Sequence, residues 1–150
     1  MNIQRVKQGA RITYANGLYM MLLGLFLAFF DNMNMKTNFI SINQLWGFFS
    51  KFNPEIAGIF LLFHILIGTL LFSSGIVIIY LSDYIMKRKE KMTWIMLFLF
   101  GIINWVALLI VAILLGNIIL ISATLLGWVT FCIGMLIPIN YYLQKSYREY

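Results

Sequence analysis

The sequence has 150 residues, of which 62% are hydrophobic and 11% carry a charge. Soluble globular domains contain about 45–50% apolar and about 25% charged residues, so this composition excludes a soluble domain and indicates an integral membrane protein. The formal net charge is +6, but the basic residues occupy short segments between apolar runs. That placement argues against nucleic acid as a partner and for contact with anionic lipid. The single cysteine, Cys132, excludes an intramolecular disulfide and a cysteine metal cluster.

The first apolar run covers residues 12–30 and follows a basic N-terminal segment, MNIQRVKQGAR. A secretory signal peptide begins in the same way, but this run ends in LAFFD, which lacks the small-x-small pattern that a signal peptidase cleaves. We therefore predict that the run remains in the protein as the first transmembrane helix.

The connection that follows contains a shorter helical pattern. Its apolar residues have the i, i+3, i+4, i+7 spacing of a helix with one apolar face. They are Leu45, Phe48, Phe49 and Phe52. We predict a short amphipathic helix at about residues 42–52 that lies in the membrane interface rather than crossing the bilayer.

Three further apolar runs predict transmembrane helices at about residues 55–82, 94–115 and 118–142. The first of these has no charged residue between Glu55 and Asp83. As a helix, residues 57–82 would be about 39 Å long, which exceeds the roughly 30 Å hydrocarbon core of a bilayer. The sequence therefore predicts an all-α membrane protein, a single domain over residues 1–150, with four transmembrane helices and one short interfacial helix.

Two local sequence signals predict a turn and a kink in the last two spans. Gly116 and Asn117 supply a left-handed helix end followed by a helix start, which predicts a tight hairpin between the third and fourth spans. Pro138 removes a backbone donor near the end of the fourth span, which predicts a kink there.

Charge asymmetry predicts the orientation. Four spans place both termini on one side, and that side carries nine Lys and Arg residues against two on the other. Because cytoplasmic segments are enriched in Lys and Arg, we predict that both termini are cytoplasmic. The loop after the second span supplies four of the nine, and we predict that they contact anionic lipid. They are Lys87, Arg88, Lys89 and Lys91.

Three of the four predicted spans carry two glycines that are seven residues apart and therefore share one face. These glycines are Gly17 and Gly24, Gly68 and Gly75, and Gly127 and Gly134. Helices associate in lipid through close backbone approach, and a seven-residue spacing favours left-handed crossing. We interpret all six as helix-packing positions, because a pore would need more polar lining than the sequence offers.

His64 is the only histidine and lies inside the second predicted span. An ionisable side chain at membrane depth is a candidate functional group. Three interpretations are open. The imidazole could be a structural group that is hydrogen-bonded to a threonine, an asparagine or a backbone carbonyl. It could instead be a proton-binding group or an axial haem ligand. Since the chain has no second histidine, a haem with two histidine ligands would have to be shared between subunits.

Two tryptophans, Trp105 and Trp128, lie near the midpoints of the third and fourth predicted spans, at the depth of Asn104 and Thr130. A buried indole N–H needs a partner, which Asn104 or Thr130 could supply. This group is either a packed aromatic core or a midplane pocket for an apolar ligand such as a quinone or lipid. The candidate ligand-binding residues are His64, Asn104, Trp105, Thr124, Trp128 and Thr130.

The sequence contains no glycine-rich phosphate loop, HExxH motif or nucleophile–base pair, and its acidic residues all lie at span ends or in loops. We therefore favour a protein without catalysis, metal or cofactor. The favoured role is an accessory or structural subunit of a larger membrane complex, or a homo-oligomer, in contact with membrane lipids. The alternatives are a binding or transport module for an apolar ligand, and an oxidoreductase subunit that shares haem through His64.

Overall fold

The computed structural model describes residues 2–29 and 45–146, and almost all of these residues are helical. The helices are α1 (Asn2–Phe29), α3 (Trp46–Phe52), α4 (Pro54–Arg88), α5 (Lys91–Leu115), α6 (Ile118–Leu136) and α7 (Ile139–Ser146). Four of them, α1, α4, α5 and α6, are long and apolar enough to cross a membrane. The chain is therefore an all-helical, multi-pass membrane protein.

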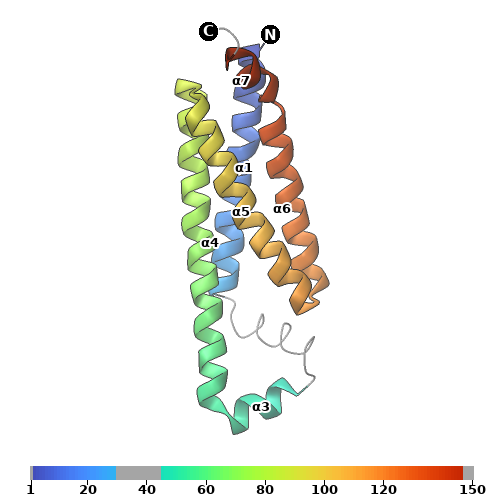
Figure 1. Ribbon diagram of the computed structural model, residues 1–150. Coiled ribbons are helices and arrows are strands. Elements are labelled where there is room, and N and C mark those ends of the chain that lie inside the picture. The colour runs from blue at the N-terminus through green and yellow to red at the C-terminus, as the bar shows by residue number, and fades with distance from the viewer. Residues whose placement is uncertain (1, 30–44, 147–150) are drawn as a thin grey trace.

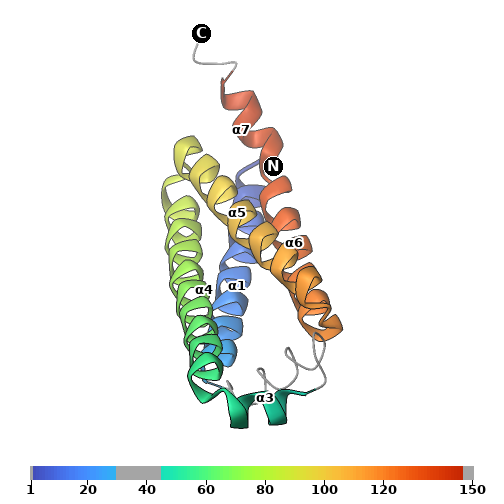
Figure 2. The ribbon, with the colours of Figure 1, turned by 60° about the horizontal axis from the view of Figure 1, so that its bottom comes forward.

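The four long helices pack side by side, and α1 lies between α4 and α6 (Figures 1 and 2). The largest interface of α1 is with α4, and its next largest is with α6. Helix α5 crosses the group obliquely and packs against both α6 and α4 (Figure 1). We call the end at which α1 begins and α7 lies the terminal end. The end at which α5 turns into α6 is the hairpin end.

The turn between α5 and α6 is as tight as the sequence predicts. Gly116 has φ +64°, a left-handed conformation that favours glycine, and it ends α5. The side chain of Asn117 then caps α6 by accepting hydrogen bonds from the backbone N–H groups of Ile119 and Leu120, at 3.1 and 3.3 Å. These two residues therefore end one helix and begin the next without a loop.

Two stretches of helix differ in extent from the predicted spans. Helix α1 begins at Asn2 rather than near residue 12, because Val6 and Ala10 are buried and continue the packed face through the polar N-terminal segment. The predicted span 118–142 is two helices, α6 and α7, separated at Ile137 and Pro138. Proline lacks the N–H that would continue the hydrogen-bond ladder, so the chain changes direction there.

Helix α3 begins at Trp46, whereas the sequence predicts a start near residue 42, and residues 42–44 lie outside the described residues. Phe49 packs edge-on against Phe60 of α4, with the ring centroids 6.5 Å apart. Phe48 and Phe52 are exposed on another side of α3. Helix α3 therefore leans against the start of α4, at an angle to it (Figure 1).

Helix α4 is much longer than the helices around it. It has 35 residues, which corresponds to about 52 Å. Phe29, the last residue of α1, lines a groove together with Ile65 of α4, so the two are at one level. Residues 54–64 of α4 therefore extend about 16 Å beyond the end of α1. We call this projecting segment the overhang, and Figure 1 shows it beyond the turn from α5 to α6.

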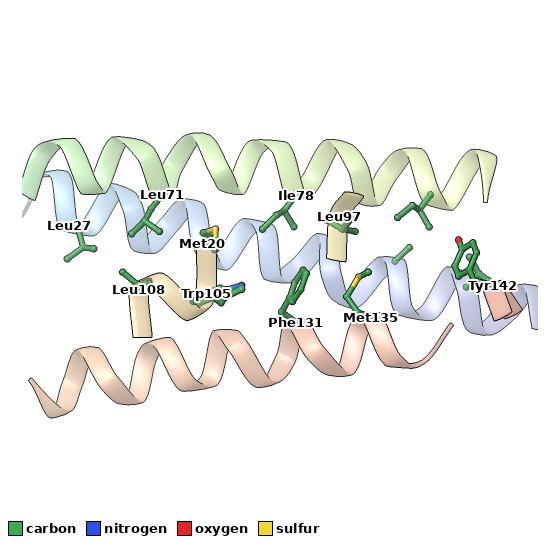
Figure 3. Close-up of a cluster of buried hydrophobic side chains, with 13 residues drawn as sticks. Met20, Leu27, Leu71, Ile78, Leu97, Trp105, Leu108, Phe131, Met135 and Tyr142 are labelled. Carbon is green, nitrogen blue, oxygen red and sulfur yellow. The ribbon is translucent and has the colours of Figure 1, made fainter. Parts of the chain in front are cut away.

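Buried side chains form a continuous line inside the group of helices, from Leu27 towards the hairpin end to Tyr142 at the terminal end (Figure 3). Met20, Trp105 and Phe131 are fully buried in the middle of this line. They come from α1, α5 and α6, and Leu71 and Ile78 of α4 belong to the same cluster, so the four long helices share one core.

Candidate functional site

The glycines of α1 and α4 lie against each other. A methyl group placed on Gly24 would lie 2.6 Å from the carbonyl oxygen of Gly68, and one on Gly75 would lie 2.7 Å from that of Gly17. Neither distance leaves room for a side chain. The four glycines therefore let the backbones of α1 and α4 approach at two levels, which is how small residues bring membrane helices together.

Glycines on α5 and α6 make room for aromatic rings instead. Gly127 of α6 faces the indole ring of Trp105, and Gly101 of α5 faces the ring of Phe131. Gly134 faces α1, where a methyl group would lie 2.8 Å from the Cγ2 atom of Thr13. Each of these glycines therefore meets a neighbouring helix rather than an open channel.

Asn16 of α1 is the centre of a buried hydrogen-bond network at the middle of the molecule. Its side chain is 3% exposed. Its Nδ2 donates to the carbonyl oxygen of Gly127 at 2.7 Å and to Oγ1 of Thr130 at 2.8 Å, and its Oδ1 accepts from Nε1 of Trp105 at 3.0 Å. We call Asn16, Trp105, Gly127 and Thr130 the polar centre. It connects α1, α5 and α6 by side-chain hydrogen bonds.

Tyr19, almost one turn further along α1, extends this network. Its hydroxyl donates to the carbonyl oxygen of Ala123 of α6 at 2.9 Å. Its ring stacks on that of Trp105, with centroids 6.1 Å apart. Trp105 is thus fixed by a hydrogen bond at its nitrogen and by a ring on its face.

Two further hydrogen bonds involve α4. Oγ of Ser82 donates to Oγ1 of Thr13 of α1 at 2.9 Å. Oγ of Ser74 donates to Oδ1 of Asn104 of α5 at 3.0 Å, and Nδ2 of Asn104 donates to the carbonyl oxygen of Phe100 at 2.8 Å. Every long helix therefore has a polar side-chain contact with a neighbour.

The predicted partners of the Trp105 indole are wrong. The indole donates to Asn16, not to Asn104 or Thr130. Asn104 and Trp105 are adjacent on α5 and therefore point about 100° apart around the helix axis. Trp105 faces α1 and α6, whereas Asn104 faces α4. Thr130 does belong to the polar centre, but it is joined to Trp105 through Asn16.

Sequence reasoning missed Asn16, although the sequence contains a signal for it. Asn16 is the only carboxamide side chain in residues 12–30, and such side chains in transmembrane helices commonly bond across to a neighbour. It follows Thr13 by three residues and precedes Met20 by four, and all three are buried on one face of α1.

The other predicted binding residues on α6 do not share one environment. The hydroxyl of Thr124 is buried and donates to the carbonyl oxygens of Leu120 and Ile121 of its own helix, at 2.9 and 3.0 Å. Nε1 of Trp128 is buried and has no hydrogen-bond partner among the described residues. Neither residue therefore joins the polar centre by a hydrogen bond.

His64 lies at the base of the overhang, away from the polar centre. Its Nδ1 is 3.2 Å from the carbonyl oxygen of Phe60, one turn earlier in α4. A backbone carbonyl was one of the partners that the sequence left open. Ser74, the α4 partner of Asn104, is ten residues further on, about 15 Å along the helix. The structure thus separates His64 from Asn104, and it places Trp105 in the interior.

Asn104 lines a groove between α4 and α5. The groove has a volume of about 190 Å³. Its lining residues are Ile67, Leu70, Leu71, Asn104, Ala107, Leu108 and Val111. The wall is aliphatic except for one carboxamide, so the groove suits an apolar chain.

The chemistry available to the described residues is limited. They contain no group of three His, Cys, Asp or Glu side chains that could hold a metal ion. Apart from Nε1 of Trp128, the polar groups described above at the middle of the helices bond to one another or to the backbone, as those of Asn16 and Ser74 do. This arrangement joins helices, and it presents no nucleophile beside a base.

No protein-family model, curated protein or solved structure matches the chain. The functional conclusion therefore rests on the packing and chemistry of the chain's own residues.

Proposed function

We propose that the chain is a non-enzymatic membrane protein with four spans, which acts as an accessory subunit packed against a second membrane protein. Both termini lie in the cytoplasm, since the terminal end carries most of the Lys and Arg residues. The hairpin end then faces outward, and α3 lies on that outer side against the start of α4.

The polar centre supports a structural role. A transport path needs polar side chains that face a continuous cavity, whereas the polar groups of Asn16, Trp105 and Thr130 are used in bonds between helices. Such bonds favour one arrangement of the helices over others. The interior is accordingly suited to a fixed scaffold.

The overhang is the observation that carries the proposal. Helix α6, with 19 residues, is about 28 Å long and matches a hydrocarbon core of about 30 Å. Helix α4 is uncharged from Glu55 to Asp83, which is about 40 Å. If α6 sets the membrane position, the overhang projects beyond the hydrocarbon core.

The surface of the overhang is apolar. The side chains of Ile59, Leu62 and Phe63 are 52%, 64% and 57% exposed. Exposed apolar patches of this kind mark sites of protein or membrane contact. The apolar surface of a second membrane protein that also extends beyond the bilayer would cover these side chains.

Site-specific photo-crosslinking tests the proposal in intact membranes. A photoreactive amino acid at Leu62 of the overhang should crosslink to one other membrane protein. The same amino acid at Leu126 of α6, which is similarly exposed at 60%, should crosslink to lipid only. Lipid adducts alone at both positions would contradict the proposal. A crosslink from Leu62 to a second copy of the chain would replace it with a homo-oligomer.

A second candidate function is a binding module for an apolar ligand, and the groove at Asn104 favours it. The carboxamide of Asn104 has an N–H beyond the one bonded to Phe100, and it could hold the carbonyl of a quinone or lipid in the groove. Lipid extracted from the purified protein should then contain such a molecule. The Asn104→Leu variant should lose it, whereas Ser122→Leu, on an exposed face of α6, should retain it.

A further inference from the structure

The N-terminal part of α1 lies beside the C-terminal part of α4. Three contacts set the register of this antiparallel pair: Gly24 with Gly68, Gly17 with Gly75, and Thr13 with Ser82. Each step back along α1 therefore corresponds to a step forward along α4. Continuing this register places residues 5–7 of α1 level with about residues 85–90 of α4 and the following turn. Packed helices lie about 8–10 Å apart.

This register brings basic residues of two helices to one level. Helix α1 contributes three, and the end of α4, the turn after it and the first residue of α5 together contribute four. They are Arg5, Lys7, Arg11, Lys87, Arg88, Lys89 and Lys91. Charge asymmetry predicts that all seven lie on one side of the membrane, but contact with anionic lipid is predicted from the sequence only for the last four.

Most of these cations have no acidic partner in the part of the chain that the structure describes. The only ion pair among the described residues joins Nζ of Lys87 to Oδ2 of Asp83 at 2.6 Å. The other nearby acid, Glu90, accepts a hydrogen bond from the hydroxyl of Thr93 at 3.0 Å. We call the six remaining cationic residues the basic end. They are Arg5, Lys7, Arg11, Arg88, Lys89 and Lys91.

The surroundings of the basic end have the mixed character of a membrane interface. Ile3 of α1 and Met92 of α5 are 51% and 59% exposed beside the cations. Trp94 lies one turn into α5 and stacks on Tyr142, with centroids 5.1 Å apart. Aromatic rings of this kind mark the headgroup level of a bilayer. An anionic phospholipid offers a phosphate for the cations and acyl chains for the apolar side chains.

We propose that the basic end binds the headgroup of an anionic phospholipid, and that one lipid engages cations of α1 and α4 together. The lipid would then link the two helices at the end where no glycine pair joins them. Charge complementarity and the shared level of the two groups support this partner over a free anion, which would make no use of Ile3 and Met92. The proposal is independent of the accessory role.

The test uses the full chain in nanodiscs of phosphatidylcholine, with or without phosphatidylglycerol, and measures the midpoint of thermal unfolding. Phosphatidylglycerol should raise the midpoint of the wild type. The double variant Lys7→Gln/Arg88→Gln should lose at least half of that gain. Its binding of phosphatidylglycerol, measured by native mass spectrometry, should weaken about fivefold for each cation removed. The control variant Lys51→Gln, which removes one charge from α3 at the opposite end, should keep the full gain.

Three results would overturn the proposal. One is a double variant with the full gain and unchanged lipid binding. Another is an equal loss in Lys51→Gln, which would indicate a general charge effect. The third is an equal rise in the midpoint of the wild type with inorganic phosphate in phosphatidylcholine nanodiscs, which would indicate an anion site. The native mass spectra give the lipid affinity of each variant even where its midpoint in phosphatidylcholine differs from that of the wild type.

Discussion

Asn16 is the residue on which the packing of α1, α5 and α6 depends. The Asn16→Leu variant would lose three hydrogen bonds and would leave the indole N–H of Trp105 buried without a partner. Hydrogen bonds between membrane helices average about 0.6 kcal/mol each, so we expect the free energy of unfolding to fall by about 2 kcal/mol. Unfolding in mixed micelles of increasing denaturing-detergent content measures this loss.

Asn104 is the matched control for Asn16, because it lies at a similar depth and bonds to one other helix through Ser74. Asn104→Leu should cost about 0.6 kcal/mol, roughly a third of the loss in Asn16→Leu. Equal losses for the two variants would show that the polar centre contributes no more to the free energy of unfolding than the single hydrogen bond between Ser74 and Asn104.

Tyr142 differs from Asn16, because its buried hydroxyl has no hydrogen-bond partner among the described residues. Removing a polar atom that makes no bond costs little, so Tyr142→Phe should be as stable as the wild type or slightly more stable. Tyr142→Ala should cost about 3–5 kcal/mol, because it empties the space of a fully buried ring. A clear loss of stability in Tyr142→Phe would reveal a partner for the hydroxyl.

Burial also raises the pKa of Tyr142 above its ordinary value of 10.0. The folded protein then holds the phenolic proton at a pH at which the unfolded chain has lost it. Stability should therefore fall as the pH rises above about 10. Tyr142→Phe should reduce the slope of this alkaline loss, as thermal unfolding midpoints between pH 8 and 11 would show.

At the level of elements, the α1–α4 pair depends on glycine. Gly75→Leu places a large side chain where even a methyl group would lie 2.5 Å from Cγ of Met21, and we expect it to cost about 1–3 kcal/mol or more. Gly58→Leu, on the same helix, is the control, because a methyl group there meets nothing within 4 Å. It should be neutral or stabilising, since glycine lowers helix propensity by about 1 kcal/mol. Equal stability of the two variants, measured by thermal unfolding in detergent, would contradict this account of the interface.

The elements themselves could be predicted from the sequence because their signals are local. Long apolar runs identify four candidate spans, and Gly116 with Asn117 identifies the turn between α5 and α6. The start of α1 could not be predicted, since its first turns are mostly polar and the burial of Val6 and Ala10 is visible only in the structure. Pro138 indicates a kink, but the pattern does not say that the helix ends there.

The candidate site was harder to predict, because a side chain's depth does not specify the direction in which it points. Asn104 and Trp105 share a depth, yet they face different helices. The partner of Trp105 lies 89 positions away along the chain, and a single sequence does not indicate which helices are neighbours. The sequence groups His64 with Asn104 as candidate ligand-binding residues, whereas the structure places His64 about 15 Å along α4 from Ser74, the partner of Asn104.

For the whole molecule, the orientation in the membrane can be tested with single cysteines in a Cys132→Ser background. Arg88→Cys at the terminal end and Lys51→Cys on α3 are both at exposed positions. We expect an impermeant thiol reagent to label Lys51→Cys in intact cells and Arg88→Cys only after the cells are opened. Labelling of Arg88→Cys from outside would reverse the orientation.

The polar centre also has a consequence for how the protein is made. The chain is synthesised from its N-terminus, so α1 enters the bilayer with Asn16 before α5 and α6 exist. Until the final hairpin arrives, the carboxamide of Asn16 lacks its three partners, although α1 and α4 can already pair. A chain that stops after residue 90 should therefore be degraded faster than the same fragment with Asn16→Leu, as pulse-chase labelling would measure. The unpaired carboxamide of Asn16 would thus allow incomplete chains to be recognised and degraded. In the complete protein, its hydrogen bonds to Trp105 and Thr130 would bury this group.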